Sequence, residues 1–350
     1  GGAGNSVYRL TKSLNKKKYN ISIICLNHCA YEKEFKKAQI KVFKINSNKV
    51  LFSIVKVQKI VNKIMINSNK TFFLSNINYT NVICSMFLKK KKNFKLIAIE
   101  RTPLKELEIY FGIKDFFKKS IIKLLIYFFY KNFDKIICNS KYLGDYLKKK
   151  YGYNSFTIYP PSIIKNTTFK KKKISNNKII LTTICRLSKE KNITEIIYAL
   201  NSLKIKNIYL NIVGDGKEKK KILSLINKLN LSKQIRLLGL KKNITKYLAK
   251  TDLYINSSLF EGFPNSVVEA IQHYIPVIAS QSHGGINEIL LNGKYGKIYS
   301  KGPDELAMYI KKFYINPNSF YNKINLSKKN SDKFNIDNNK KNFENLFKNF

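Results

Sequence analysis

Short apolar runs rich in β-branched residues alternate with amphipathic stretches of ten to fifteen residues from about residue 20 onward. This alternation is typical of repeated βα units, whose parallel strands are buried between helices. It predicts six strands in each half of the chain, at residues 21–26, 40–45, 71–74, 96–99, 135–138, 156–158, 179–184, 208–213, 235–238, 253–257, 276–280 and 297–299. Each half is therefore expected to be a doubly wound α/β domain.

Both periodicities break off near residue 160. The two prolines of Tyr159-Pro160-Pro161 cannot continue a helix, and the lysines at 170–173 repel one another. We therefore expect an N-terminal domain over residues 1–162 and a second domain over 163–325. Residues 326–350 are expected to form a C-terminal helical tail that docks through an apolar stripe of Phe343, Leu346, Phe347 and Phe350.

The chain is strongly basic, with 66 Lys and Arg against 21 Asp and Glu and a formal charge of +45 over 350 residues. Acidic partners are therefore expected, while a hydrophobic content of 44% argues against a natively unfolded chain. The lysines are dispersed, whereas a nucleic-acid reader would concentrate its charge beside aromatic stacking platforms. The charge is the only support for a basic nucleic-acid-binding protein, which is therefore the alternative hypothesis. No nucleic-acid partner is expected.

The five cysteines form no CxxC pair, so we expect no zinc site and a reducing, cytoplasmic environment. No run of eighteen apolar residues predicts a membrane span. Residues 116–133, however, mix Lys118, Lys119, Lys123 and Lys131 with large apolar side chains. Such a helix either lies on an anionic bilayer or is a core helix whose lysines reach out to water, and both alternatives stay open.

The segment from Glu261 to Glu269, EGFPNSVVE, follows the expected strand 253–257. It therefore lies at the carboxyl end of a strand, where open α/β sheets bind ligands. Its glycine and proline favour a tight turn, after which Asn265 or Ser266 can cap a helix whose free N–H groups bind phosphate. The structural alternative is that Ser266 and Glu269 form a capping box.

A second loop, CRLSKEKN at residues 185–192, follows the expected strand 179–184. Its two cations, Arg186 and Lys191, could clamp a diphosphate, although Lys191 alone would more often be a solvated surface charge. Gly214-Asp215-Gly216 forms a sharp turn that allows a ligand to approach closely but is also common in ordinary strand-to-helix turns. The absence of a GxGxxG fingerprint and of a P-loop weakens the case for nicotinamide or ATP-type sites.

Together these loops resemble the retaining nucleotide-sugar glycosyltransferases of family 4, of the type that builds bacterial surface polysaccharides. The resemblance covers nearly the whole chain, from Gly1-Gly2-Ala3-Gly4 through CRLSKEKN and VGDG to EGFPNSVVE and HGGINEIL. It implies the α/β GT-B fold, with two doubly wound Rossmann-like domains facing a cleft. The spacing of Glu261 and Glu269, with Arg186 and Lys191 before them, is its most specific part.

The resemblance also implies roles for individual residues. Arg186 and Lys191 would bind the donor diphosphate, Glu261 the hydroxyls of the donor sugar, and Glu269 the ribose. Glu261, Arg186 and Lys191 are the expected catalytic residues. Further donor contacts are expected from Gly1, Gly2, Gly214, Phe263, Pro264, Asn265 and Ser266. No Asp-x-Asp pair is present to hold a divalent ion, so neither a metal nor a cofactor is expected.

Two departures from the family pattern concern local geometry, and a third concerns the start of the chain. Cys185 and Tyr274 stand where the family usually has glycine. The second of these positions commonly ends a helix with positive φ, so Tyr274 either tolerates strain there or the turn differs. The family's first strand should precede Gly1-Gly2, so the chain is expected to lack one strand at its start.

The stretch Ile99-Glu100-Arg101-Thr102-Pro103 resembles the [SE]-R-x-x-P stretch of the polysaccharide-building members. It implies that Glu100 and Arg101 are on the acceptor side. The alternative, without a functional role, is that the two residues form a surface ion pair at the end of a strand. The expected activity is retaining transfer of a hexose or N-acetylhexosamine from a nucleotide-diphosphate sugar to a lipid-linked or surface-saccharide acceptor. UDP is the nucleotide expected first. The enzyme would lie peripherally on the cytoplasmic face of an anionic membrane. A GT-B epimerase or phosphorylase is the alternative within the same fold.

Overall fold

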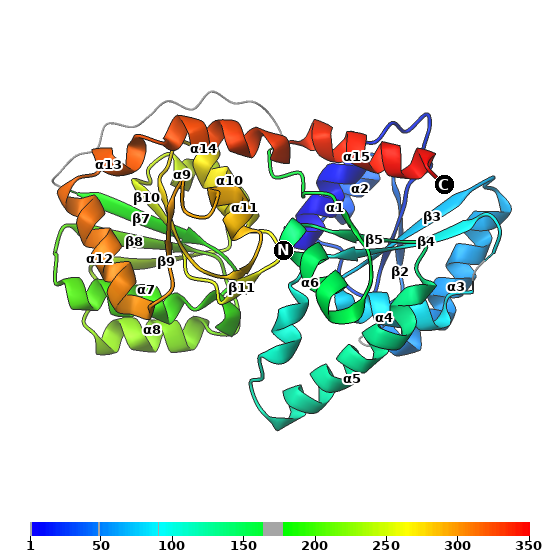
Figure 1. The fold of residues 1–350 in the computed structure, drawn as a ribbon, viewed down its shortest axis with the longest axis horizontal. Coiled ribbons are helices and arrows are strands. Elements are labelled where there is room, and N and C mark those ends of the chain that lie inside the picture. The colour runs from blue at the N-terminus through cyan, green and yellow to red at the C-terminus, as the bar shows by residue number, and fades with distance from the viewer. Residues whose placement is uncertain (1, 48–49, 90, 164–177) are drawn as a thin grey trace. The chain divides into compact units, whose positions relative to one another are not determined.

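The computed structural model describes residues 2–47, 50–89, 91–163 and 178–350 (Figure 1). The chain forms two compact units, one of Gly1–Pro161 together with Ile336–Phe350 and the other of Ser162–Asn335. The division therefore differs from the expected domains in the C-terminal part. Residues 326–335 belong to the second unit, whereas the terminal helix returns to the first.

The first unit contains a four-stranded parallel sheet in the order β3-β4-β5-β6 and a separate parallel pair, β1-β2. The strands are β1 (Ser22–Cys25), β2 (Lys41–Lys44), β3 (Thr71–Asn76), β4 (Phe94–Glu100), β5 (Lys135–Cys138) and β6 (Phe156–Thr157). The helices are α1 (Gly2–Ser13), α2 (Glu32–Lys37), α3 (Val50–Ile66), α4 (Asn78–Phe87), η1 (Leu104–Glu108), α5 (Ile113–Phe129), η2 (Tyr130–Asn132), α6 (Lys141–Tyr151) and α15 (Ile336–Lys348).

Strand β4 is buried on both faces because helices cover both sides of its sheet. Leu96 and Ala98 pack in one core with side chains from α3, α4 and α5. Ile97 and Ile99 point to the opposite face and pack with α1 and α15. Figure 1 shows these two helical layers on either side of the sheet. The alternation along β4 decides the surroundings of Glu100 and Arg101 at its end.

Helix α15 docks on the first unit through the apolar stripe visible in the sequence. Phe343 and Leu346 are buried there, and the ring of Phe347 stacks on Phe72 with centroids 4.6 Å apart. Asn339 Nδ2 also donates a hydrogen bond to Tyr159 O at 2.7 Å. The prediction of a docked terminal helix is therefore confirmed.

The second unit is built on a six-stranded parallel sheet in the order β14-β12-β10-β7-β8-β9. Its strands are β7 (Ile179–Ile184), β8 (Ile208–Val213), β9 (Ile235–Gly239), β10 (Leu253–Asn256), β12 (Val277–Ser280) and β14 (Lys297–Tyr299), with a small parallel pair of β11 (Phe260–Glu261) and β13 (His283–Gly284). The helices are η3 (Lys189–Lys191), α7 (Ile193–Leu203), α8 (Lys219–Lys228), α9 (Thr245–Leu248), α10 (Asn265–Gln272), α11 (Ile286–Leu290), α12 (Gly302–Ile315), α13 (Asn318–Tyr321), α14 (Ile324–Ser331) and η4 (Asp332–Phe334).

All twelve expected strands are present, with ends within two residues of the predicted ones. The pair β11-β13 was not predicted, because two-residue strands carry no periodicity. Tyr274 adopts φ of 58°, so the residue tolerates the left-handed conformation at the end of its helix. Within the described residues, no helix is both long and apolar enough to cross a membrane.

Candidate functional site

Two glycines of the turn after β8 support the loop that carries Arg186. A Cβ atom on Gly214, where φ is 145°, would lie 1.8 Å from the backbone oxygen of Cys185, and one on Gly216 would lie 2.2 Å from that of Leu187. Leu187 N also donates a hydrogen bond to Asp215 O at 3.0 Å. The glycines are thus required for two loops to pack backbone against backbone, whatever contact Gly214 makes with a ligand.

The loop after β7 is also fastened to the loop after β10. Ser257 Oγ donates a hydrogen bond to Lys191 O at 2.8 Å, and Leu259 N donates one to Glu190 O at 2.8 Å. These bonds join two loops at the carboxyl ends of neighbouring strands. Residues about seventy positions apart in sequence are thereby brought together at one edge of the sheet.

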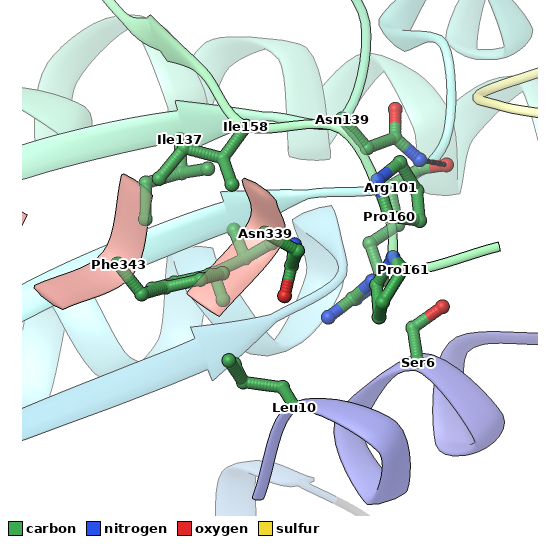
Figure 2. Close-up of a pocket in the computed structure, with 11 residues that line it drawn as sticks. Ser6, Leu10, Arg101, Ile137, Asn139, Ile158, Pro160, Pro161, Asn339 and Phe343 are labelled. Carbon is green, nitrogen blue, oxygen red and sulfur yellow. Dashed lines mark hydrogen bonds between the residues drawn. The ribbon is translucent and has the colours of Figure 1, made fainter. Parts of the chain in front are cut away.

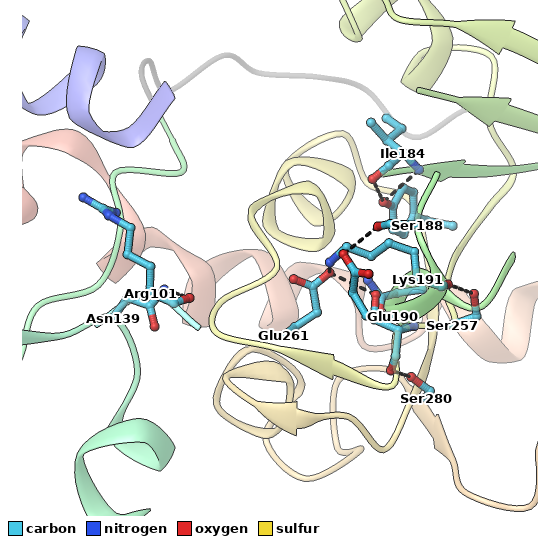
Figure 3. A network of polar contacts seen from close by, with 12 residues as sticks. Arg101, Asn139, Ile184, Ser188, Glu190, Lys191, Ser257, Glu261 and Ser280 are labelled. Atoms are coloured by element: carbon cyan, nitrogen blue, oxygen red, sulfur yellow. Dashed lines mark hydrogen bonds and ion pairs between the residues drawn. The ribbon is translucent and has the colours of Figure 1, made fainter. Parts of the chain in front are cut away.

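Lys191 and Glu261 form an ion pair at this edge, with 2.6 Å between Nζ and Oε1 (Figure 3). Their side chains are only 13% and 16% exposed. The interpretation of Lys191 as a solvated surface charge is therefore wrong. The structure brings together two of the three expected catalytic side chains, and low exposure strengthens their attraction.

The backbone of Glu261 is held by the pair β11-β13. Glu261 aligns with Gly284, where φ is 146°, and a Cβ atom on that glycine would lie 1.4 Å from Glu261 O. Only glycine fits such a contact at this φ. Gly284 is a site-shaping residue that the sequence reasoning placed in a motif but did not assign to this contact.

Helix α10 begins at Asn265 with Pro264 as its N-cap and no side-chain capping bond. Ser266 therefore lies inside the first turn and Glu269 in the second, so the capping-box alternative is wrong. Asn265 Oδ1 instead accepts a hydrogen bond from Ser162 Oγ at 2.6 Å. Phe263 turns its ring into the core against Phe334, which leaves only its backbone for a ligand.

The side chain of Arg186 is exposed on the same loop as Lys191, and its guanidinium has no hydrogen bond or ion pair to any residue that the structure describes. Glu269 is partly exposed on α10. Both positions belong to the second unit, as do Gly214 and the segment from Glu261 to Ser266. Of the expected glycines in the first unit, Gly2 is exposed at the start of α1, and Gly1 lies outside the described residues.

Glu100 does not reach a surface that an acceptor could contact. It is 1% exposed and accepts hydrogen bonds from Tyr130 Oη and, at 2.6 Å, from Asn81 Nδ2. Burial raises the pKa of its carboxyl group to about 7, against the two hydrogen bonds that lower it. Its expected role on the acceptor side is therefore corrected to a position in the core.

Arg101, the next residue, points to the other face of the sheet and lines a small pocket (Figure 2). Its Nε donates a hydrogen bond to Asn76 Oδ1 at 2.8 Å, and burial lowers its pKa to about 10. The pocket, with a volume of about 10 Å³ and polar lining from Ser6, Asn139 and Asn339, is large enough for one water molecule. Glu100 and Arg101 thus form no surface ion pair with each other.

Replacement of Glu100 by glutamine is expected to remove a pH dependence of stability. A carboxyl pKa raised by folding from 4.5 to about 7 makes the free energy of unfolding fall as pH rises between these values. Above pH 7 the wild type carries an unfavourable buried charge, which Glu100→Gln lacks. Urea unfolding at pH 8 should show the variant more stable by about 1–3 kcal/mol, and the difference should disappear at about pH 4, below both pKa values. A difference that does not change with pH would contradict this assignment.

Three serines take part in the site, although no sequence pattern predicted a role for them. Ser257 and Ser258 follow β10, and Ser280 ends β12. Ser258 Oγ donates to Glu261 Oε1 at 3.0 Å, and Ser280 Oγ donates to Ser258 O. Serine is common at strand ends, so only the three-dimensional contacts distinguish these three.

Two family models match the chain. The model described as Glycosyltransferase Family 4 matches residues 1–163, and the one described as Glycosyl transferases group 1 matches residues 164–331. The chain is 31% identical over 223 residues to a glycosyltransferase of Methanocaldococcus jannaschii. The match covers 60% of this chain and 53% of that protein. It is 28% identical over 252 residues to an enzyme of Campylobacter jejuni, with 71% of this chain and 67% of that protein covered. That enzyme is named N-acetylgalactosamine-N,N'-diacetylbacillosaminyl-diphospho-undecaprenol 4-alpha-N-acetylgalactosaminyltransferase.

Two solved structures share the fold. The Anabaena protein HepE in complex with UDP-glucose superimposes with a TM-score of 0.80 at 19% identity, covering 100% of this chain and 96% of that one. Sucrose-phosphate synthase from Thermosynechococcus elongatus gives a TM-score of 0.84 at 15% identity, covering 100% and 93%. At these identities the likeness concerns the fold alone. Since the two family models together match residues 1–331, the chain belongs to glycosyltransferase family 4 and has the GT-B fold, with two Rossmann-like domains.

Proposed function

We propose that this protein transfers a hexose or an N-acetylhexosamine from a UDP-sugar, with retention, to a lipid-linked or surface-saccharide acceptor. The observation that carries the proposal is the ion pair of Lys191 and Glu261 at the carboxyl end of the second unit's sheet, with Arg186 on the same loop as Lys191. Cations and a hydroxyl-binding carboxylate on neighbouring loops match the two parts of a nucleotide-sugar, its diphosphate and its sugar. The UDP-glucose complex of HepE supports the choice of UDP as the nucleotide.

The group that most needs stabilisation during the reaction is the leaving diphosphate, because its negative charge grows as the bond to the sugar breaks. Arg186 presents a planar fork for phosphate oxygens, and Lys191 presents an ammonium group already oriented by Glu261. Positive groups fixed before the reaction stabilise such developing charge without reorganisation. The departing diphosphate then takes the proton of the acceptor hydroxyl, which attacks from the same face.

A lipid-linked acceptor is supported by the diphospho-undecaprenol in the name of the Campylobacter relative and by the surface of helix α5. This helix leaves large apolar side chains in solvent: Ile113, Phe117, Ile121, Leu124, Tyr127 and Phe128 are each at least 50% exposed. Its opposite side packs inward through Ile122 and Ile126. A core helix alone does not need such an exposed face, so we place α5 on the anionic cytoplasmic surface of a membrane.

The lysines of α5 are tied into the local structure. Lys119 pairs with Asp115 at 2.8 Å, and Lys123 donates a hydrogen bond to Tyr110 Oη at 2.8 Å. Replacement of these lysines would loosen the loop before the helix as well as remove charge. The apolar face therefore offers a cleaner test of membrane binding.

The double variant Phe117→Ser and Leu124→Ser is expected to bind vesicles containing phosphatidylglycerol at least about tenfold more weakly than the wild type. Each side chain loses roughly 1.5–3 kcal/mol of apolar burial, while its exposure in the free protein spares the fold. Vesicle flotation measures the loss, and binding of the wild type should also weaken as salt rises. Leu240→Ser with Ile315→Ser is the matched control, since both residues are exposed in the second unit. Equal flotation of all three proteins would contradict the assignment of α5 to the membrane.

A donor panel tests the proposed activity. The protein is incubated with UDP-glucose, UDP-galactose and their N-acetylated counterparts, with and without membrane lipid extract. Released UDP is followed by mass spectrometry, and the configuration of the sugar in the products by NMR. UDP release from one donor, with retention of the anomeric configuration in the product, is expected. Conversion of the sugar without release of UDP would favour an epimerase. Binding of RNA or DNA with no turnover of any donor would overturn the proposal in favour of a nucleic-acid-binding protein.

A further inference from the structure

Ser258 contacts the ion pair of the candidate site from a buried position. It is 2% exposed, and its Oγ donates a hydrogen bond at 3.0 Å to Glu261 Oε1. This is the same oxygen that accepts the hydrogen bond from Lys191 Nζ. Two hydrogen-bond donors therefore converge on one oxygen of the Glu261 carboxylate.

The backbone of Ser258 is itself held from two sides. Its N–H donates to Asn256 Oδ1 at 3.3 Å, and its carbonyl oxygen accepts a hydrogen bond from Ser280 Oγ. The ends of strands β10 and β12 thus fix the position from which the Ser258 hydroxyl reaches Glu261. Because its backbone is anchored in this way, the Ser258 hydroxyl orients the Glu261 carboxylate instead of moving with it.

The second oxygen of Glu261, Oε2, accepts no hydrogen bond from any residue in the described part of the chain. We infer that Ser258 is a positioning residue that assigns Oε1 to Lys191 and keeps Oε2 available to a hydroxyl group of the donor sugar. The inference rests on the proposed function and adds a residue to it. Ser258 does not touch the substrate but acts through Glu261.

The end of a glutamate side chain rotates easily, because its terminal torsion has broad, roughly two-fold minima. Without the Ser258 hydroxyl, the carboxylate is free to turn so that both oxygens approach the Lys191 ammonium group. Oε2 would then be drawn away from the sugar, whereas the uridine and diphosphate contacts would not change. The effect of losing Ser258 should therefore depend on whether the ligand has a sugar.

The test compares UDP with the UDP-sugar that the donor panel selects, using calorimetry and steady-state kinetics on wild type and Ser258→Ala. UDP affinity is expected to stay within about twofold, while affinity for the UDP-sugar and kcat/KM fall about tenfold. In a Glu261→Ala background, Ser258→Ala should produce no further loss, because the group through which it acts is absent.

Ser331→Ala serves as the matched control. Ser331 is also fully buried, donates to Lys328 O at 2.7 Å and accepts a hydrogen bond from Gln272 Nε2, but it lies outside the candidate site. It should lower the melting temperature about as much as Ser258→Ala and leave UDP-sugar affinity unchanged.

Equal losses of UDP and UDP-sugar affinity in Ser258→Ala would overturn the inference, as would additive losses in the double variant. Unchanged UDP-sugar affinity in Ser258→Ala would overturn it as well. A wild type that binds neither UDP nor any UDP-sugar would instead overturn the proposed function, and the inference with it.

Discussion

Gly284→Ala is expected to lower kcat/KM for the donor by at least about 100-fold, because the new side chain collides with the backbone that carries Glu261. The Cβ atom would lie 1.4 Å from Glu261 O, a separation that no rotation of a side chain can relieve. Strand β13 must move away from β11, and Glu261 must move with its strand. A displacement of about 1 Å at a catalytic group is enough for a loss of about 100-fold. Steady-state UDP release measures it.

Gly239→Ala separates this effect from the general cost of adding a side chain to a glycine of positive φ. Gly239 belongs to the same unit and has φ of 71°, yet a Cβ atom there meets nothing within 4 Å. This variant should lose about 1 kcal/mol of unfolding free energy and keep its activity. Equal losses of activity in both variants would show that Gly284 does not act through Glu261.

The strands of both units could be predicted because each is an apolar run between amphipathic helices, and burial on both faces of a parallel sheet demands such runs. The terminal helix was predictable from its stripe at helical spacing. The division of the chain into two units could be predicted from the sequence only in part. Assignment of residues 336–350 to the first unit depends on contacts such as Phe347 on Phe72, which join residues far apart in the sequence.

The charged residues of the candidate site were visible in the sequence, but their partners were not. Lys191 and Glu261 are seventy positions apart, and only the pairing of loops after β7 and β10 brings them to 2.6 Å. Glu100 illustrates the opposite failure. Its place beside Arg101 suggested a shared role, whereas alternation along a strand sends neighbouring side chains to opposite faces. That alternation was available from sequence and would have separated the two residues.

Glu269→Gln and Arg186→Ala are both expected to weaken UDP binding with little change in stability. Glu269 is the expected acceptor for ribose hydroxyls, and its replacement removes one charged hydrogen-bond partner. Arg186 should show the larger effect, because it is the guanidinium on the diphosphate side. Each loss of a charged hydrogen-bond partner costs roughly 1.5–3 kcal/mol, which corresponds to about 10–150-fold in affinity.

The expectation for Arg186→Ala follows from the guanidinium having no partner among the described residues. The side chain is exposed, so its removal takes no contact from the folded chain and should change the unfolding free energy by at most about 0.5 kcal/mol. An effect on UDP binding, measured by calorimetry, would therefore come from the ligand alone. Arg236→Ala provides the control for net charge, because Arg236 is an exposed arginine of the same unit that lies on β9. Should both arginine variants bind UDP as the wild type does, Arg186 cannot belong to the donor site, since an unpartnered guanidinium on a diphosphate must contribute to its binding.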